Sequence, residues 1–183
     1  MRIVSWNVNG LRPLKGYQPW YSHKSFAESL QYLQADIACF QECKLTRKTL
    51  LNEPSLGPSV CVVDGYQAYY NLHPEKGYSG TSIWTRNDVC MPLKAEEGIT
   101  GRYALSGGPG GSITAALPGT SASGLKDSER IGCYPVDMKD EMDLQLYKGI
   151  DDEGRGVVLD CGMFVLFNLY CPNETGPERL PYK

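Results

Sequence analysis

Two polar side chains follow the first two apolar, strand-like segments of this sequence, at the points where those segments end. Asn7 follows the segment 3–6, and Glu42 comes just after the segment 36–40. Strand ends in layered α/β structures open into the cleft where ligands bind, and a carboxylate there needs a cation, hydrogen bonds or solvent. Mg²⁺ sites often use only one or two carboxylates. The pattern therefore fits a magnesium site, but it equally fits strand ends that simply meet water.

Four short segments weigh against that second interpretation. They resemble signatures of the exonuclease III family of AP endonucleases, within the endonuclease/exonuclease/phosphatase superfamily, and they occur in that family's order. The likeness is to the AP endonuclease 2 branch of fungal type, and it runs through nearly the whole chain. The four segments are Ser5–Arg12 (SWNVNGLR), Phe40–Lys44 (FQECK), Lys76–Gly80 (KGYSG) and Leu169–Asn173 (LYCPN).

The resemblance implies a role for each matching residue of a catalytic centre. Glu42 is expected to be the carboxylate ligand of Mg²⁺, with Mn²⁺ as a possible substitute, and Asn7 to complete or orient the metal site. Tyr170 is expected to set its phenol against the scissile phosphate or a nearby catalytic group. One exchange leaves these roles intact, because the family's Gln-Glu-Thr-Lys reads Gln-Glu-Cys-Lys around Cys43.

The resemblance also implies contacts to DNA. Tyr78, Arg12 and Lys44 are expected to grip the DNA backbone, and Asn173 to hydrogen-bond a phosphate oxygen. Taken without the resemblance, each has a plainer interpretation: Lys44 as a solvated surface cation, and Tyr78 as one of twelve tyrosines that pack with the hydroxyl at the rim.

Two further signatures of the family are missing from the sequence. The family carries a downstream Gly-Asp-x-Asn segment and a later Asp-His pair, and neither follows Asn173. The two histidines, His23 and His73, lie in other contexts. We therefore expect residues 1–183 to be the amino-terminal portion of a single domain, with little or no nuclease activity of its own.

The implied function is a nuclease of DNA base-excision repair. It is expected to hydrolyse phosphodiesters with Mg²⁺, 5′ to abasic sites and at blocked 3′ ends, on double-stranded DNA in the nucleus. Two alternatives stay open: another phosphoesterase of the same fold, and a non-catalytic DNA-binding fragment. The sequence identifies no protein partner.

The elements that must position these residues can be read from apolar patterns. Ser25 and Glu28 form a capping box ahead of an amphipathic helix. Strands are expected over 66–70, 81–85, 156–160 and 163–170, the last two as a hairpin turning near Cys161-Gly162. Consecutive strands predict an α+β fold. The resemblance specifies part of a four-layer α/β/β/α sandwich of the DNase I type, incomplete at the carboxy end.

Composition adds limits of its own. A net charge of −3 does not indicate a nucleic-acid-binding protein, although a few local cations suffice for phosphate contacts. No apolar run is long enough for a membrane span, and no signal-peptide pattern opens the chain, so an intracellular protein is expected. The seven cysteines have neither zinc nor disulfide-framework spacing and are expected to act as small hydrophobes. Residues 104–126, rich in Gly and Ser, are expected to form a flexible insertion.

Overall fold

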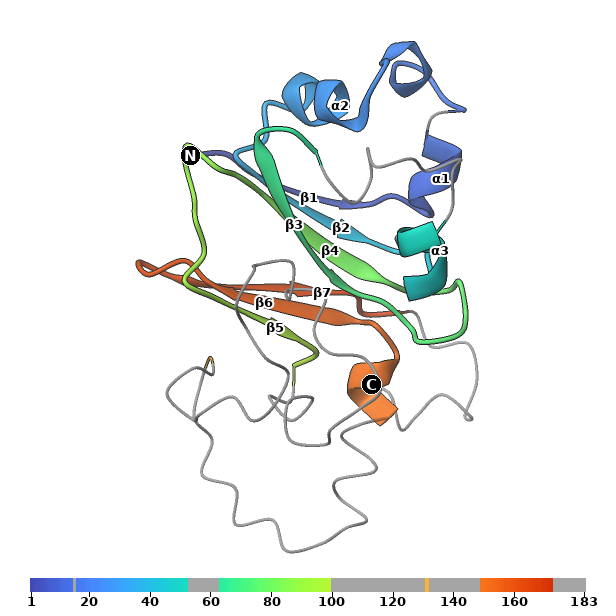
Figure 1. Cartoon of the computed structure of the whole chain (residues 1–183), viewed down its shortest axis with the longest axis vertical. Helices are drawn as coiled ribbons and strands as arrows, with labels where there is room; N and C mark the ends of the chain where they lie inside the picture. The colour runs from blue at the N-terminus through green and yellow to red at the C-terminus, as the bar shows by residue number, and fades with distance from the viewer. Residues whose placement is uncertain (15, 53–62, 100–130, 132–148, 173–183) are drawn as a thin grey trace, which may run out of the picture.

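Two β-sheets packed face to face form the centre of the molecule (Figure 1). The computed structural model describes residues 1–14, 16–52, 63–99, 131 and 149–172. Within this part, helices cover the outer side of the first sheet, so the order of layers is helix, sheet, sheet. The predicted α+β fold is confirmed. No helix in the described residues is long and apolar enough to cross a membrane. The predicted 104–126 insertion lies outside the described residues.

The first sheet has the order β1-β2-β4-β3. Its strands are β1 (Ile3–Asn7), β2 (Ile37–Gln41), β3 (Tyr66–Asn71) and β4 (Thr81–Arg86). β1 and β2 run parallel, with Asn7 opposite Gln41, and the other pairs are antiparallel. A parallel pair needs a long crossover, which here contains α1 (Leu11–Leu14), η1 (Trp20–Ser22) and α2 (Phe26–Tyr32). This connection places the ends of β1 and β2 side by side.

The second sheet has the order β5-β6-β7, all antiparallel. Its strands are β5 (Lys94–Glu97), β6 (Gly156–Asp160) and β7 (Val165–Leu169). The hairpin predicted at Cys161-Gly162 is confirmed, since the Cys161 amide donates to the Phe164 carbonyl at 2.9 Å. β7 is shorter than the predicted strand. Its alternate residues Val165, Phe167 and Leu169 are exposed on the outer face of the sheet.

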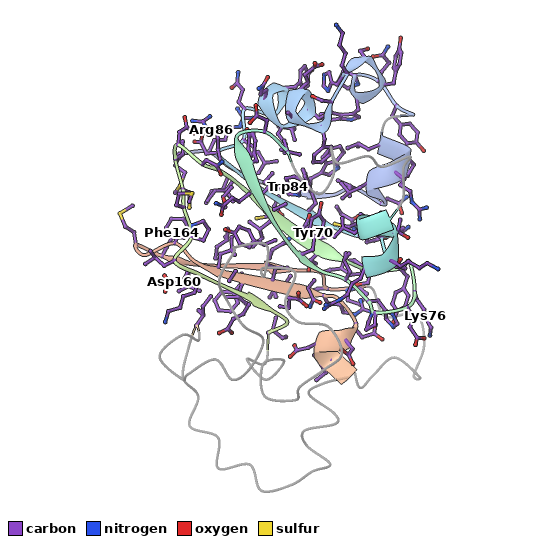
Figure 2. The ribbon with its side chains drawn as sticks, viewed as in Figure 1. Tyr70, Lys76, Trp84, Arg86, Asp160 and Phe164 are labelled. Carbon is purple, nitrogen blue, oxygen red and sulfur yellow. The ribbon has the colours of Figure 1, made fainter. Side chains whose placement is uncertain are left out.

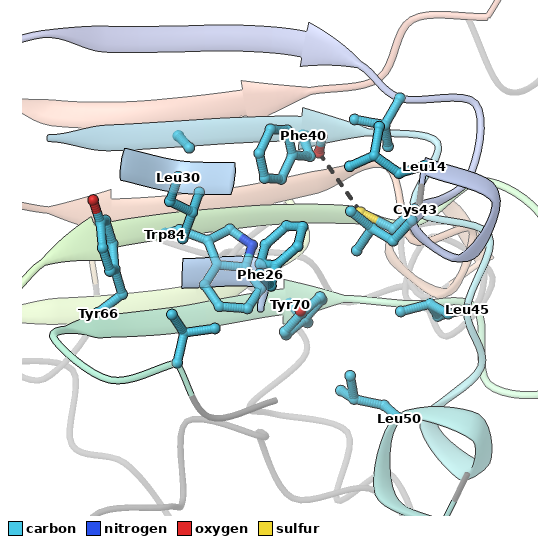
Figure 3. Close-up of a cluster of buried hydrophobic side chains, with 14 of the residues drawn as sticks. Leu14, Phe26, Leu30, Phe40, Cys43, Leu45, Leu50, Tyr66, Tyr70 and Trp84 are labelled. Carbon is cyan, nitrogen blue, oxygen red and sulfur yellow. Dashed lines mark hydrogen bonds between the residues drawn. The ribbon is translucent and has the colours of Figure 1, made fainter. Parts of the chain in front are cut away.

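The larger core lies between the first sheet and the helices (Figure 3). Trp84 of β4 and Phe40 of β2 are fully buried there, and Phe26 of α2 packs against both rings. The predicted cap of α2 is present in modified form. Ser25 Oγ accepts from the Glu28 amide at 3.3 Å, while the Glu28 carboxylate accepts from the Lys24 amide at 2.8 Å rather than from that of Ser25.

A smaller core and two buried amides join the sheets. Ile37, Cys39 and Ile83 of the first sheet pack against Val157 and Leu159 of β6. The side chain of Asn168 on β7 reaches across: its Nδ2 donates to the carbonyls of Phe40 at 3.0 Å and Ser82 at 2.9 Å, and its Oδ1 accepts from Gln41 Nε2 at 2.6 Å. Asn71 Nδ2 on β3 donates to the carbonyls of Asp151 and Gly156.

The buried cysteines behave as the predicted small hydrophobes. Cys39, Cys43 and Cys90 are buried free thiols. Burial raises the pKa of Cys39 to about 11 and that of Cys43 to about 12, so both stay uncharged at neutral pH.

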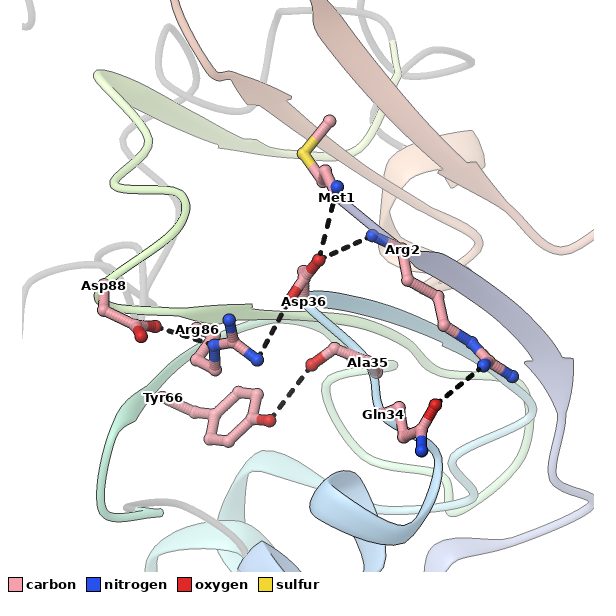
Figure 4. Close-up of polar contacts among 8 residues, drawn as sticks. All are labelled: Met1, Arg2, Gln34, Ala35, Asp36, Tyr66, Arg86 and Asp88. Carbon is pink, nitrogen blue, oxygen red and sulfur yellow. Dashed lines mark hydrogen bonds and ion pairs between the residues drawn. The ribbon is translucent and has the colours of Figure 1, made fainter.

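Ion pairs lie at both ends of the first sheet. α3 (Arg47–Asn52) follows β2, and Arg47 pairs with the buried Glu97 of β5. At the opposite end of the first sheet, Asp36 accepts from the Arg2 amide at 2.6 Å and pairs with Arg86 at 2.9 Å (Figure 4). Figure 2 shows Arg86, which marks the Asp36 end of the first sheet, far from Lys76 at the other end of the molecule.

Candidate active site

Asn7 and Glu42 meet where β1 and β2 end. The register of the parallel pair sets Asn7 beside Gln41, and Glu42 then leaves the strand with a left-handed φ of 55°. Asn7 Nδ2 donates to Glu42 Oε1 at 2.8 Å, and Asn7 Oδ1 accepts from the Asn9 amide at 3.0 Å. The structure thus brings together the two residues that the sequence singled out as a metal site. Asn9, which accepts a hydrogen bond from Lys44, was not anticipated.

Lys44 lies on the other side of the same carboxylate. Its Nζ is 3.3 Å from Glu42 Oε2, and its backbone φ of 51° turns the side chain toward the site. Arg12, exposed on α1, directs Nη2 at the Lys44 carbonyl over 3.5 Å. Of the two predicted DNA-contacting cations, Lys44 therefore lies beside Glu42, and Arg12 contacts the backbone of Lys44.

The surroundings of Glu42 hold its pKa below the ordinary value. The largest cause is the hydrogen bond from Asn7; the Tyr170 hydroxyl and Lys44 act in the same direction, and partial burial opposes them. Each of these contacts favours the charged form of the carboxyl group. The site therefore presents a carboxylate at neutral pH, with Tyr170 hydrogen-bonded to it.

Tyr170 is held by Arg155, the residue that directly precedes β6. Its amide donates to the Arg155 carbonyl at 2.8 Å, which continues the β6–β7 ladder one step beyond the strand. The Arg155 guanidinium carbon lies 5.2 Å from the centre of the Tyr170 ring, a cation–π distance. The predicted catalytic tyrosine is therefore fixed through both its backbone and its ring.

Tyr78 reaches the site indirectly. Its hydroxyl donates to Glu153 Oε1 at 2.6 Å, and Glu153 Oε2 is 2.9 Å from Arg155 Nη2. The His73 ring packs against Tyr78 with centroids 4.9 Å apart. The predicted DNA-contacting tyrosine is thus linked to Tyr170 through a carboxylate and a guanidinium.

Glu153 and Arg155 are site residues that sequence reasoning missed. They belong to the segment 151–155, a charged run that carries no recognisable chemistry by itself. They are oriented by Gly154, whose φ is 69° and whose carbonyl accepts from the Gly80 amide at 3.1 Å. A Cβ added to Gly154 would lie 2.7 Å from the His73 amide nitrogen, so only glycine allows this approach.

The donors around Glu42 fit a hard cation with few protein ligands. In the part of the chain that the structure describes, no three His, Cys, Asp or Glu side chains gather in a way that could hold a metal ion. One carboxylate with water is nevertheless a common arrangement for Mg²⁺, and Asn7 supplies an amide beside it. Asn173, the predicted phosphate ligand, lies outside the described residues.

Comparison with known proteins defines the class to which this fold and site belong. Residues 4–179 match the Endonuclease/Exonuclease/phosphatase family, and the chain belongs to that family. The expected resemblance is confirmed.

Individual relatives narrow the comparison to one kind of protein within the family. The chain is 38% identical over its whole length to DNA-(apurinic or apyrimidinic site) endonuclease 2 of Schizosaccharomyces pombe, of which it covers 31%. It is 32% identical to the endonuclease of that name from Homo sapiens, of which it covers 33%. The chain thus spans about a third of the length of these relatives.

A solved structure agrees with both the fold and the sequence. The chain superposes on the Xenopus laevis APE2 catalytic domain with a TM-score of 0.65 and 30% identity, covering 100% of this chain and 49% of that one. An AP endonuclease from Leishmania major shares the fold, with a TM-score of 0.52 and 24% identity.

Proposed function

We propose that this chain carries the metal-binding half of a DNA-repair nuclease that cuts phosphodiesters with Mg²⁺. The observation that carries the proposal is Glu42, kept ionised at the junction of β1 and β2 by Asn7, Lys44 and Tyr170. Relatives called AP endonuclease 2 support abasic DNA as the substrate class. The proposed reactions are incision 5′ to an abasic site and removal of blocked 3′ ends, in the nucleus.

Glu42 would hold the ion, with Mn²⁺ as a substitute, and Asn7 would orient the carboxylate through its hydrogen bond at 2.8 Å. A bound Mg²⁺ would supply charge stabilisation for a pentavalent phosphate. Lys44 already rests on Glu42 Oε2, so the ammonium would move from the carboxylate toward a DNA phosphate when the ion binds.

The remaining residues would act on the DNA. The phenol of Tyr170, hydrogen-bonded to Glu42, would contact the scissile phosphate. Arg12, Lys44 and Tyr78 would bind backbone phosphates, and Asn173 is proposed to bind a phosphate oxygen. Such preorganised donors are worth about 10²–10³ in rate each. Because the Gly-Asp-x-Asn and Asp-His signatures are absent from the sequence, we expect cleavage by this chain alone to be slow or absent.

The test measures metal binding and DNA binding separately from turnover. Mg²⁺ titrated calorimetrically into the purified chain should bind, and Glu42→Gln should weaken that binding by at least about tenfold. The matched control is Glu28→Gln in α2, which makes the same chemical change in a capping residue that glutamine replaces well. It should bind Mg²⁺ like the wild type.

Binding to an abasic-site duplex should fall steeply with salt, and any Mg²⁺-dependent cleavage should disappear with Glu42→Gln. Mg²⁺ affinity that is equal in the wild type and in Glu42→Gln would refute the metal site. Hydrolysis of a phosphoinositide in preference to abasic DNA would favour another phosphoesterase of this fold. Salt-sensitive DNA binding without Mg²⁺ binding would favour a non-catalytic binding module.

A further inference from the structure

A chain of contacts joins Tyr78 to Glu42 across the two sheets. Tyr78 donates to Glu153 at 2.6 Å, and Glu153 pairs with Arg155 at 2.9 Å. Arg155 stacks on Tyr170, and Tyr170 in turn hydrogen-bonds Glu42. Contacts therefore run without a break from the proposed DNA-contacting residue Tyr78 to the proposed metal ligand Glu42. The proposed function assigns no role to Glu153 and Arg155, the two residues in the middle.

The central pair is built in a way that stability alone does not explain. The side chains of Arg155 and Glu153 are only 15% and 17% exposed. Within the described residues, Nε and Nη1 of Arg155 are buried without a hydrogen-bond partner. Burying unpaired donors of a cation costs free energy, and a well-packed apolar side chain would avoid that cost. What the arginine does provide is a planar cation that stacks on a ring and pairs with a carboxylate at the same time.

Backbone hydrogen bonds fix the turn that carries Glu153 and Arg155 to both sheets. Gly154 lies between the two residues, and its carbonyl accepts a hydrogen bond from the amide of Gly80, two residues after Tyr78. The Arg155 carbonyl accepts from the Tyr170 amide. The turn is thus anchored to the first sheet on one side and to β7 on the other, which orients Glu153 toward Tyr78 and Arg155 toward Tyr170.

We propose that Glu153 and Arg155 form a positioning pair that sets the Tyr170 phenol on Glu42 and couples its placement to Tyr78. This inference rests on the proposed function, because it assigns the pair to the same metal and phosphate site. When Tyr78 engages a DNA phosphate, its hydroxyl loosens from Glu153, and the change passes through Arg155 to the ring that contacts the metal ligand. Glu153 and Arg155 position other groups and are not themselves catalytic residues.

The test follows the Tyr170 ring and the Mg²⁺ site in the purified chain. Tyrosine-labelled NMR spectra give ring signals, and Tyr170→Phe identifies those of Tyr170. Arg155→Met should move the Tyr170 signals and raise the Kd for Mg²⁺ by about tenfold, the usual scale for loss of a group that orients a metal ligand. Arg155→Lys should give an intermediate effect, because it keeps the charge but loses the planar fork.

Coupling is tested by a double-mutant cycle. Tyr78→Phe removes one hydroxyl and should shift the Tyr170 signals in the wild-type background. In the Arg155→Met background the same change should leave them where they are, because the link is already cut. A merely structural role for Arg155 predicts that the two substitutions act independently.

Arg86→Met is the matched control. Arg86 is also ion-paired, with Asp36 at 2.9 Å and Asp88 at 2.7 Å, but it lies at the other end of the first sheet (Figure 2). It should leave both the Tyr170 signals and the Mg²⁺ affinity unchanged. Circular dichroism confirms that each variant is folded, and Arg155→Lys decides the matter should Arg155→Met fail to fold.

The outcomes separate this inference from the proposed function. Glu42-dependent Mg²⁺ binding that is the same within twofold in Arg155→Met and Arg155→Lys, with unmoved Tyr170 signals, would overturn the positioning role and leave the proposed function standing. Absence of Mg²⁺ binding in the wild type would refute the proposed function. The Tyr78–Tyr170 coupling would still be measured by the ring signals, and additive shifts would overturn it.

Discussion

Lys44 occupies one side of the carboxylate on which the proposed function depends. Its ammonium is 3.3 Å from Glu42 Oε2, yet its side chain is 39% exposed. An ion pair so open to water contributes about 0–1 kcal/mol, so a divalent cation can displace it at little cost. The same lysine can then turn to an incoming phosphate. The hydrogen bond from Asn7 is the largest cause that holds the pKa of Glu42 low, and the weak pair with Lys44 adds to it without blocking the site.

Asp36 gives a prediction about acid stability. Its pKa is lowered, first by the Arg2 amide and then by Arg86 and the amino terminus, while burial opposes them. A carboxyl group whose folded-state pKa is lowered stabilises the fold above its unfolded pKa of about 3.9, and that stabilisation is lost as pH falls through the lower folded value. Asp36→Asn should therefore be less stable at neutral pH and lose less stability between about pH 5 and pH 2.

Denaturant unfolding at each pH measures both effects. Asp88→Asn is the control, because Asp88 pairs with the same arginine but is 72% exposed and contributes little. An acid limb equally steep in Asp36→Asn and in the wild type would contradict the assignment.

At the scale of elements, Asn168 connects β7 to β2 and β4. Its side chain is 3% exposed and bonds to Phe40, Ser82 and Gln41 directly below the candidate site. Asn168→Leu keeps the branching at Cγ but is larger and removes the hydrogen bonds to two buried carbonyls, so it should lower the free energy of unfolding by about 2–4 kcal/mol. Chemical denaturation measures the loss. Val165→Thr, on the exposed face of the same strand, should stay within about 0.5 kcal/mol. Equal losses in the two variants would contradict the role of Asn168.

Elements with strong apolar patterns were predictable from the sequence, and those held by tertiary contacts were not. β2 is buried at every position, so its apolar run showed clearly. β5 is Lys-Ala-Glu-Glu, which does not alternate. It becomes a strand because Ala95 packs into the core between the sheets and Glu97 meets Arg47. α1 was missed because Pro13 and the nearby glycines are typical of turns.

The same division applies to the candidate site. Asn7 and Glu42 could be found because Asn7 ends one strand and Glu42 follows another, and the parallel register brings these strand ends together. Glu153 and Arg155 stand in a charged run, 151–155, which is usually a solvated surface. They are largely buried where Gly154 comes close to the backbone of Leu72 and His73, and no local pattern encodes that approach.

At the scale of the whole molecule, the outer face of β7 carries three exposed apolar side chains at alternate positions. Phe167 is 56% exposed, Val165 45% and Leu169 44%. Contiguous apolar surface on a strand promotes association. Phe167→Ser should therefore reduce concentration-dependent self-association, measured by light scattering after size exclusion. Tyr21→Ser, which removes a comparably exposed aromatic from η1, should not. Equal association of Phe167→Ser and the wild type would contradict this.

The hydrogen bond between Gln41 and Asn168 joins residues 127 positions apart. Contacts of such long range close late, because the entropy of the intervening loop is paid first. During synthesis, β1 and β2 leave the ribosome long before β7 does, so Glu42 is made before Tyr170 is available to contact it. We expect the proposed metal centre to form in a single late step, when the β6–β7 hairpin packs against the first sheet.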